Sequence, residues 1–324
     1  MEKNEIVLKC EIPVIASRMR RSNPDSPYRG MEGRLLRAVA LAMTTTIMLG
    51  CTEPITIKTD DSPPVVAIYS ELTNELKNQK IMISRSSPYF EDQPNEGVTN
   101  AEVVVSSSEG ETYRFIENDS IKGLYLSQKK FGVKSGVNYN LSAAVDTNHD
   151  GVPDVYQAST MVLPAIVPDS LSINPIDVFG RKNYILFAYF QDPPEDSYFL
   201  YNVYKNDTLL TDQISKYIVT DDALFKGQNI TDNVYFFKDA SQWKTDPEEE
   251  RKRSAYLSKG DIITTEIREI PKGYYDFISQ CQKEKNGENP MFGGPSSNIN
   301  TNISNGGVGY FVGYCVERRS IEFK

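Results

Sequence analysis

The segment Asp146–Asp154 holds the side chains best suited to bind a metal ion. Its oxygen-bearing residues stand at the first, third, fifth and ninth positions, as Asp146, Asn148, Asp150 and Asp154. Alternating oxygens around a glycine turn suit Ca²⁺, a hard cation that prefers carboxylate and amide oxygens. The twelfth position carries Gln157 instead of a bidentate glutamate, and no flanking helices are expected. A polar hairpin tip is the alternative, because Asn, Asp and Gly favour turns.

Cys51 has the surroundings of a lipid attachment site. It follows the apolar run Ala38–Gly50, which Arg34 and Arg37 precede. A basic start, a short apolar core and a small residue before cysteine form the pattern of a bacterial lipoprotein signal. We therefore expect the mature chain to begin at an acylated Cys51 and to sit on a membrane without spanning it.

A buried helix is the alternative interpretation of this apolar run. The run is shorter than the roughly 20 residues that a membrane-spanning helix needs. It is followed at once by the polar stretch Lys58–Pro64, which a core helix would not require. Residues 1–30 have no apolar period, so residues 1–50 are interpreted as a misassigned leader and a signal peptide, with Met31 as the favoured start. Residues 51–63 would then form a tether.

The remaining cysteines and the single histidine limit the possible chemistry. Cys281 and Cys315 could form a disulfide in an exported protein, or remain two small core hydrophobes. His149 is the only histidine, which removes most Ser-His-Asp, Cys-His and multi-histidine metal sites. No pair of carboxylates stands out as an acid–base couple. We therefore expect no enzymatic activity, with a hydrolase as a remote alternative.

The charge of the chain excludes some partners. The sequence has 35 Lys and Arg residues and 44 Asp and Glu residues. Residues 1–50 hold 8 of the basic and 5 of the acidic residues, which leaves 27 and 39, a net charge of −12, for residues 51–324. So acidic a chain argues against nucleic acid as a partner. It also argues against adhesion to anionic lipid, so the acyl anchor is expected to be its only membrane contact.

The hydrophobic pattern predicts a mainly β protein. Residues 64–165 are expected to form a β-sandwich of about seven short strands separated by turn residues. The order Gly-x-Tyr … Gly-x-x-Tyr-x-Leu within it resembles immunoglobulin-like prealbumin modules, which implies that type of sandwich. The strand-like segments lie at 65–69, 80–84, 101–106, 112–116, 123–126, 136–145 and 156–163. A hinge is expected at 164–175, where three prolines fall within a short stretch.

Residues 166–324 are expected to form a second β-rich domain with one amphipathic helix. Strands are expected at 184–190, 198–204, 235–237, 261–267 and 307–316. The helix is expected near 272–285, because four apolar residues fall on one helical face: Tyr274, Phe277, Ile278 and Cys281. The final strand places residues 308, 310, 312, 314 and 316 on one face and residues 309, 311, 313 and 315 on the other.

The stretch 289–311 carries the most specific resemblance. Its asparagines, glycines and phenylalanine resemble the closing motif of a Bacteroidota lipoprotein family, the domain-of-unknown-function 4249 family: Asn298, Asn302, Gly306, Gly307, Gly309 and Phe311. The acidic-Phe-x-Gly segment of that family is similar to Asp221, Phe225 and Gly227, and the opening after Cys51 is similar too. The resemblance covers essentially all of 51–324.

This resemblance implies a lipid-anchored outer-membrane protein of the cell envelope, more often surface-exposed than periplasmic. Members are often encoded beside a TonB-dependent receptor, so the resemblance implies an accessory binding partner of such a receptor in nutrient uptake. It supplies neither catalytic residues nor a ligand. A structural or assembly subunit of an outer-membrane complex is the main alternative. The amides near Asn302 could bind a sugar or a partner, or could shape a crossing into the final strand.

Calcium binding at 146–154 is directly testable. If Ca²⁺ binds only the folded protein, a hundredfold excess over Kd raises the free energy of unfolding by about 2.7 kcal/mol. Thermal melting of the mature protein in millimolar calcium and in chelator measures this difference. The variant Asp146→Asn should remove it, and identical melting curves of the unmodified chain in both buffers would show a plain turn.

Overall fold

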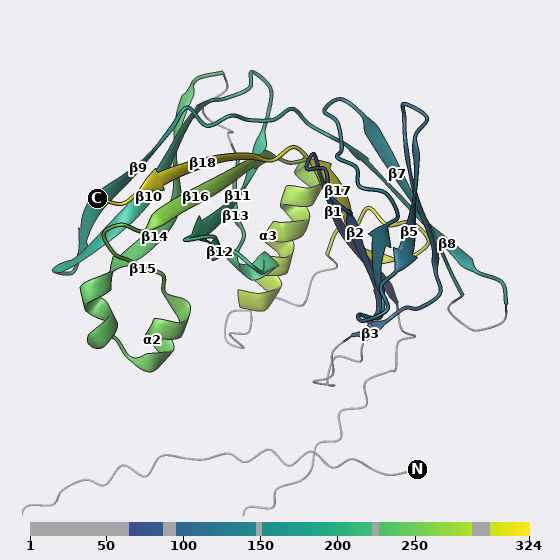
Figure 1. Ribbon diagram of the computed structural model, residues 1–324, viewed down its shortest axis with the longest axis horizontal. Coiled ribbons are helices and arrows are strands. Elements are labelled where there is room, and N and C mark those ends of the chain that lie inside the picture. The colour runs from purple at the N-terminus through teal and green to yellow at the C-terminus, as the bar shows by residue number, and fades with distance from the viewer. Residues whose placement is uncertain (1–64, 87–94, 147–150, 222–226, 287–298) are drawn as a thin grey trace, which may run out of the picture. The chain divides into compact units, whose positions relative to one another are not determined.

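The computed structural model describes residues 65–86, 95–146, 151–221, 227–286 and 299–324 (Figure 1). This part of the chain is mainly β, which confirms the predicted fold class. Its strands form three sheets. Among the described residues, no helix is both long and apolar enough to cross a membrane.

The first sheet contains strands from both ends of the described chain. Its order is β17-β1-β2-β6-β5-β4-β7-β8, with β3 beside β2. The strands are β1 (Val66–Thr73), β2 (Lys80–Arg85), β3 (Glu96–Gly97), β4 (Glu102–Ser107), β5 (Thr112–Glu117), β6 (Leu124–Ser127), β7 (Asn138–Val145), β8 (Asp154–Met161) and β17 (Val308–Tyr314). All their pairings are antiparallel except β1 with β17, which is parallel.

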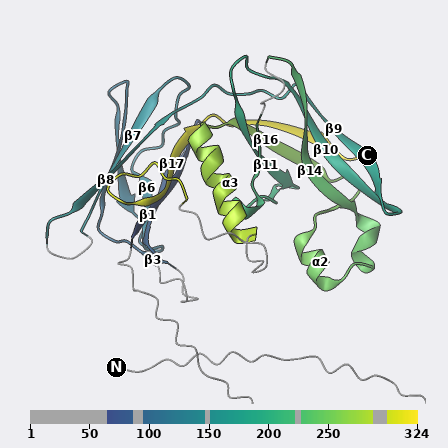
Figure 2. The same ribbon diagram turned by 180° about the vertical axis from the view of Figure 1, so that it is seen from behind.

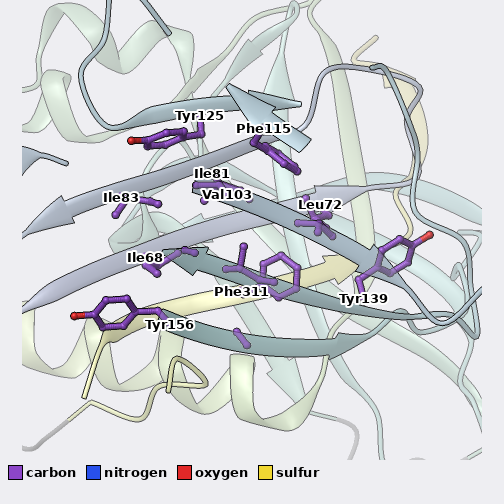
Figure 3. Close-up of a cluster of buried hydrophobic side chains, with 14 of the residues drawn as sticks. Ile68, Leu72, Ile81, Ile83, Val103, Phe115, Tyr125, Tyr139, Tyr156 and Phe311 are labelled. Carbon is purple, nitrogen blue, oxygen red and sulfur yellow. The ribbon is translucent and has the colours of Figure 1, made fainter. Parts of the chain in front are cut away.

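Alternating burial gives this sheet one core. In β8, for example, Tyr156 and Ala158 are buried while Gln157 and Ser159 are exposed. Inward side chains from all but the shortest strand form one cluster, part of which Figure 3 shows around Ile68 and Phe311. The two edge strands also meet, because the Gly313 amide of β17 donates to Thr160 Oγ1 of β8 at 3.2 Å. The sheet therefore closes around its own core.

Strand β17 is buried on both faces from Tyr310 to Tyr314. Phe311 belongs to the first core, whereas Val312 and Tyr314 pack against the C-terminal helix. Gly309 has a φ of +100°, and a Cβ there would lie 2.2 Å from the Ile68 carbonyl oxygen, so only glycine fits this approach. β17 lies in the range 166–324 and pairs with a strand of the range 64–165; the predicted division of the chain into domains stays a prediction.

Two further sheets follow. One has the order β15-β14-β10-β9, with β9 (Ser170–Val178), β10 (Arg181–Gln191), β14 (Asn229–Asp239) and β15 (Tyr256–Leu257). The other has the order β12-β11-β16-β18, with β13 beside β11; its strands are β11 (Tyr198–Lys205), β12 (Thr208–Leu209), β13 (Ile218–Asp221), β16 (Ile262–Glu269) and β18 (Glu317–Glu322). Side chains of both sheets, such as Phe190 and Phe199, form a second core.

The predicted amphipathic helix is confirmed as α3 (Lys272–Asn286). Tyr274, Phe277 and Ile278 are buried in a third cluster with Leu200 of β11 and Val312 of β17. Figures 1 and 2 show α3 beside β17 and β11, which belong to different sheets. The helical segments not expected from the sequence are α2 (Glu248–Arg253), η1 (Ile214–Lys216) and η2 (Ala240–Lys244).

The hinge predicted at 164–175 was partly wrong, because strand β9 begins at Ser170 and continues through Pro175 to Val178. Proline lacks the amide that a central strand must donate, but an edge strand tolerates it. β9 is such an edge, and Pro175 lies opposite Tyr184 of β10. Strand β18 also escaped prediction, because most of its residues are charged or polar and not one is fully buried.

The turn between β9 and β10 has an unusual residue in it. Phe179 and Gly180 form a two-residue turn between Val178 and Arg181, with φ values of 53° and 76°. Two positive φ values in such a turn favour Asn, Asp or Gly, because a left-handed backbone costs other residues about 1–2 kcal/mol. The ring of Phe179 has a relative exposure of 102%, so no packing offsets this cost.

The variant Phe179→Asn should therefore raise the free energy of unfolding by about 1 kcal/mol. Chemical denaturation of the two proteins measures the difference. Phe179→Ala is the matched control, since it removes the ring but keeps an unfavourable φ, and it should leave stability nearly unchanged. A less stable Asn variant would mean that the ring packs in solution.

Candidate functional site

The densest polar cluster surrounds the carboxylate of Glu71 on β1. Its Oε1 accepts hydrogen bonds from the hydroxyls of Tyr274 at 2.5 Å, Tyr69 at 2.7 Å and Tyr217 at 3.3 Å. The Tyr69 and Tyr274 hydroxyls also lie 2.7 Å apart. These tyrosines come from β1, from α3 and from the residue after η1. One carboxylate thus connects the first sheet to the helix and to the third sheet.

Burial keeps these phenols neutral. It raises the pKa of Tyr69 and Tyr274 well above the usual value, and the nearby Glu71 carboxylate raises each pKa further. The pKa of Tyr217 is raised for the same two reasons. A neutral phenol can donate its proton to a carboxylate, whereas a phenolate would repel it. The three neutral phenols are therefore the donors around the Glu71 carboxylate.

A second cluster consists of charged side chains on β16, β18 and the turn after β1. The carboxylate of Glu266 on β16, which is 1% exposed, accepts from the guanidinium of Arg268 and from Arg318 Nε at 2.7 Å. Arg318 on β18 also reaches Glu75, with 2.6 Å between its Nη2 and the Glu75 Oε1. The buried guanidinium of Arg268 lies over the ring of Tyr314, 4.8 Å from its centroid.

These two clusters act as a joint. Their carboxylates are already occupied by phenol or guanidinium donors, and breaking one partner of a buried pair is far more costly than its formation is favourable. A catalytic carboxylate needs access to substrate and a pKa matched to proton transfer. Buried, bonded groups such as Glu266 and Arg268 instead fix the geometry between sheets. The role that these groups support is therefore structural: they hold the sheets and the helix in position.

Two hollows in the surface of the described chain could hold a ligand. One, of about 340 Å³, is lined by the end of β8, the segment before β11, the end of β16, the start of α3 and β17; its lining includes Glu195, Glu269, Lys272 and Tyr310. The other, of about 510 Å³, lies over β4, β7 and β8 and is lined mainly by neutral polar side chains: Ser106, Asn140, Ser142, Gln157, Ser159 and Asn302. Asn302 borders both.

The Asn302 amide is committed to the backbone. Its Nδ2 donates to the carbonyls of Phe311 at 2.7 Å and Ser159 at 3.2 Å, while its Oδ1 accepts from the Phe311 amide at 2.9 Å. Two residues on, Ser304 exchanges hydrogen bonds with the backbone of Gln157 on β8. This segment therefore fills the seam between β17 and β8, which supports the structural interpretation of the asparagine-rich motif.

The other residues of the closing motif also allow close packing around β17. Gly306 has a φ of +71°, and a Cβ on Gly307 would lie 2.7 Å from Ile303 and 3.0 Å from Tyr156. Gly309 meets β1, and Phe311 fills the first core. Asn298 lies outside the described residues.

The acidic-Phe-x-Gly segment lies away from this seam. Asp221 ends β13 and accepts from the Tyr275 hydroxyl of α3 at 3.2 Å. Gly227 has a φ of +69°, and its amide donates to the Pro193 carbonyl at 3.0 Å. Phe225 falls outside the described residues. The structure does not bring Asp221 and Gly227 into contact with the closing motif.

The candidate calcium loop is described only at its ends. Asp146 follows β7, and its Oδ2 accepts from the Gly151 amide at 3.1 Å, which is a turn-forming contact. Asp154 begins β8, while Asn148 and Asp150 lie outside the described residues. Within the described ranges, no three His, Cys, Asp or Glu side chains form a group that could hold a metal ion. Calcium binding here stays a prediction.

The cysteines fall in different places. Cys315 is a buried free thiol of the first core, and Cys281 is a half-buried free thiol beside the third cluster. Both cysteines are free thiols in this structure, and only Cys315 is buried as a core hydrophobe would be. Burial raises the pKa of both thiols, which disfavours reactive thiolates. Cys51 lies outside the described residues, so its lipidation stays a prediction.

Together, the fold and the site define a mainly β protein in which one helix and a buried tyrosine–carboxylate joint connect the first and third sheets. The family model described as "Domain of unknown function (DUF4249)" matches residues 52–320. Because the match spans most of the chain, the protein belongs to this family, as the closing motif had indicated. A search of curated proteins found no match.

The ion pair of Glu75 gives the joint a pH dependence. Although partial burial opposes ionisation, hydrogen bonds from Lys77 and Arg318 lower the pKa of Glu75 from 4.5 to about 2. A lowered folded-state pKa stabilises the protein above pH 4.5, and this contribution disappears as the pH falls toward 2.

The variant Glu75→Gln should lose about 1–2 kcal/mol of stability at pH 7, after allowance for solvent screening, and little at pH 2. Denaturant titrations between these pH values measure the difference. Arg114→Gln, which removes an exposed ion pair with Glu102, is the control and should follow the pH curve of the unmodified protein. Parallel curves for Glu75→Gln and the unmodified protein would contradict the assignment.

Proposed function

We propose that the protein is a lipid-anchored binding protein of the outer membrane, acylated at Cys51, and an accessory partner of a TonB-dependent receptor. The observation that carries the proposal is the apolar run Ala38–Gly50 ending at Cys51. The polar stretch that follows suits a tether between a bilayer and the first strand, β1. The resemblance at 289–311 to a lipoprotein family found beside such receptors supports the choice of partner.

The arrangement of polar groups favours binding over chemistry. The most buried carboxylate of the joint, Glu266, is committed to two guanidinium groups, and Glu71 is committed to three phenols. The single histidine offers little material for a catalytic set. A tethered protein needs only a modest interface, because its effective concentration near a partner in the same membrane is high.

A structural or assembly subunit of an outer-membrane complex is the second candidate, since a rigid joint of this kind serves a scaffold equally well. The two candidate functions differ in the partner that the protein binds. A transport accessory binds one receptor, whereas an assembly subunit binds the machinery that inserts outer-membrane proteins. A hydrolase remains the remote third candidate.

Affinity purification of the tagged, full-length gene product from detergent-solubilised native membranes tests the first candidate. We expect mass spectrometry to show enrichment of a TonB-dependent receptor over an unrelated lipoprotein control. The matched variant Cys51→Ala should lose its acyl mass, leave the membrane fraction and recover far less receptor, because it loses the tether.

Two outcomes would contradict the proposal. An N-terminus that carries no acyl group on Cys51 would remove the anchor. Enrichment of assembly-machinery subunits without a receptor would replace the transport function by the structural one.

A further inference from the structure

The turn between β9 and β10 presents a large apolar side chain that folding does not use. Phe179 is fully exposed and has a φ of 53°, where Asn, Asp or Gly is preferred. The turn is well formed without help from the ring, because Asp177 Oδ1 accepts from the Gly180 amide at 2.7 Å. Strained residues kept at exposed sites point to function. Phe179 is therefore a candidate contact residue.

A second exposed aromatic residue lies at the same end of this sheet. Trp243 in η2 is 49% exposed. Its neighbour Gln242 donates to the carbonyl of Lys182 at 2.7 Å, which holds η2 against the start of β10. Arg181, next to the turn, donates to the buried Asp246 at 2.8 Å. Figure 1 shows the β9–β10 turn close to the segment that carries α2, and the opposite view in Figure 2 agrees.

The position of Trp243 is fixed on one side only. Its ring packs edge-on against Tyr256, with centroids 5.1 Å apart, and Arg251 lies 5.5 Å from the ring centroid. Three cationic residues near the two aromatic residues in the sequence are exposed: Lys182, Lys244 and Arg181, which also pairs with Asp246. An exposed carboxylate, that of Asp177, lies at the same turn, where it accepts from the Gly180 amide. The nearby acidic Glu248 and Glu249 pair with Lys252. The end of the sheet thus combines exposed rings with cations in an otherwise acidic chain.

We propose that Phe179 and Trp243 insert into the headgroup region of a phospholipid bilayer, with Arg181, Lys182 and Lys244 at the level of the phosphates. Aromatic rings flanked by long cationic side chains are the residues that favour this interface. The β9–β10 turn stands at the extremity of its sheet (Figure 1), and this tip of the sheet carries a fully exposed ring. Such a turn suits a soft bilayer, which needs no shaped pocket to receive the ring.

This inference rests on the proposed anchor at Cys51. Residues 52–64, fully extended, span at most about 45 Å, so the anchor holds the described chain near the bilayer. A weak second contact then suffices. It adds to the acyl anchor, which the acidic composition suggested would act alone, and it depends on the rings more than on anionic lipid. The contact would fix which face of the protein is turned to the membrane.

Trp243 is the only tryptophan of the chain, so its fluorescence reports on the tip alone. The lipidated mature protein is reconstituted into phosphatidylcholine vesicles with and without brominated acyl chains. We expect the emission to move to shorter wavelength in vesicles and brominated lipid to quench it. Phe179→Asn should reduce the ratio of inserted to free tip about tenfold, because one aromatic side chain is lost from the interface.

Matched variants separate this role from folding. Phe179→Asn should melt at the same or a higher temperature, so its lost quenching cannot reflect misfolding. Leu76→Asn replaces another exposed apolar residue, 75% exposed in the turn after β1, and should leave quenching unchanged. Intact mass of each sample verifies the acyl group on Cys51; its absence would remove both the anchor and the tip proposal.

With the acyl group verified, three results would overturn the tip proposal alone. Emission that brominated lipid does not quench would show that Trp243 stays in water. Quenching that persists in Phe179→Asn would remove Phe179 from the contact. A shift that appears only in native outer membranes, and not in protein-free vesicles, would assign the tip to a protein partner.

Discussion

The parallel pairing of β1 with β17 is the constraint on which the rest of the structure depends. It aligns Ala67–Thr73 with Val308–Tyr314, so a strand from near the C-terminus completes the sheet that the first strand begins. One face of β17 completes the first core through Phe311, and the other gives α3 a surface to pack on through Val312 and Tyr314. The glycine at 309 makes the approach possible. Tyr274 of α3, which packs in one cluster with Val312 and Tyr314, also donates to Glu71 on β1.

The sequence predicted helices and strands better than it predicted which strands pair and which side chains meet. The alternation over 307–316 indicated a strand, and the apolar face of 272–285 indicated α3, because local periodicity reports secondary structure. Neither pattern says which strand lies alongside, so the pairing with β1 was not predictable. Glu71 gave no signal either, since its partners Tyr217 and Tyr274 lie 146 and 203 positions away. The prolines at 164–175 favoured a hinge, so β9 was not predicted. The asparagine-rich family motif bonds β17 to β8, which its sequence did not indicate.

The buried polar side chains and the exposed β9–β10 turn differ in how well their residues are stabilised. Inside, Glu71 and Glu266 are bonded to phenol and guanidinium donors, among them Tyr274 of α3 and Arg318 of β18. At the β9–β10 turn, Phe179 has neither packing nor a relaxed backbone. Selection for stability alone accounts for the first arrangement but not for the second.

The β1–β17 pairing also dictates when the chain can fold. Asn74 and Val316, which bond to each other at 2.9 Å, are 242 positions apart. Contacts this distant form slowly, because a long loop must close before they contribute any stability. The first sheet cannot complete its core until Ile303, Phe311 and Cys315 have arrived. A chain interrupted before residue 300 would leave the β1 and β8 edges open to aggregation and proteolysis, so only complete copies reach the native state.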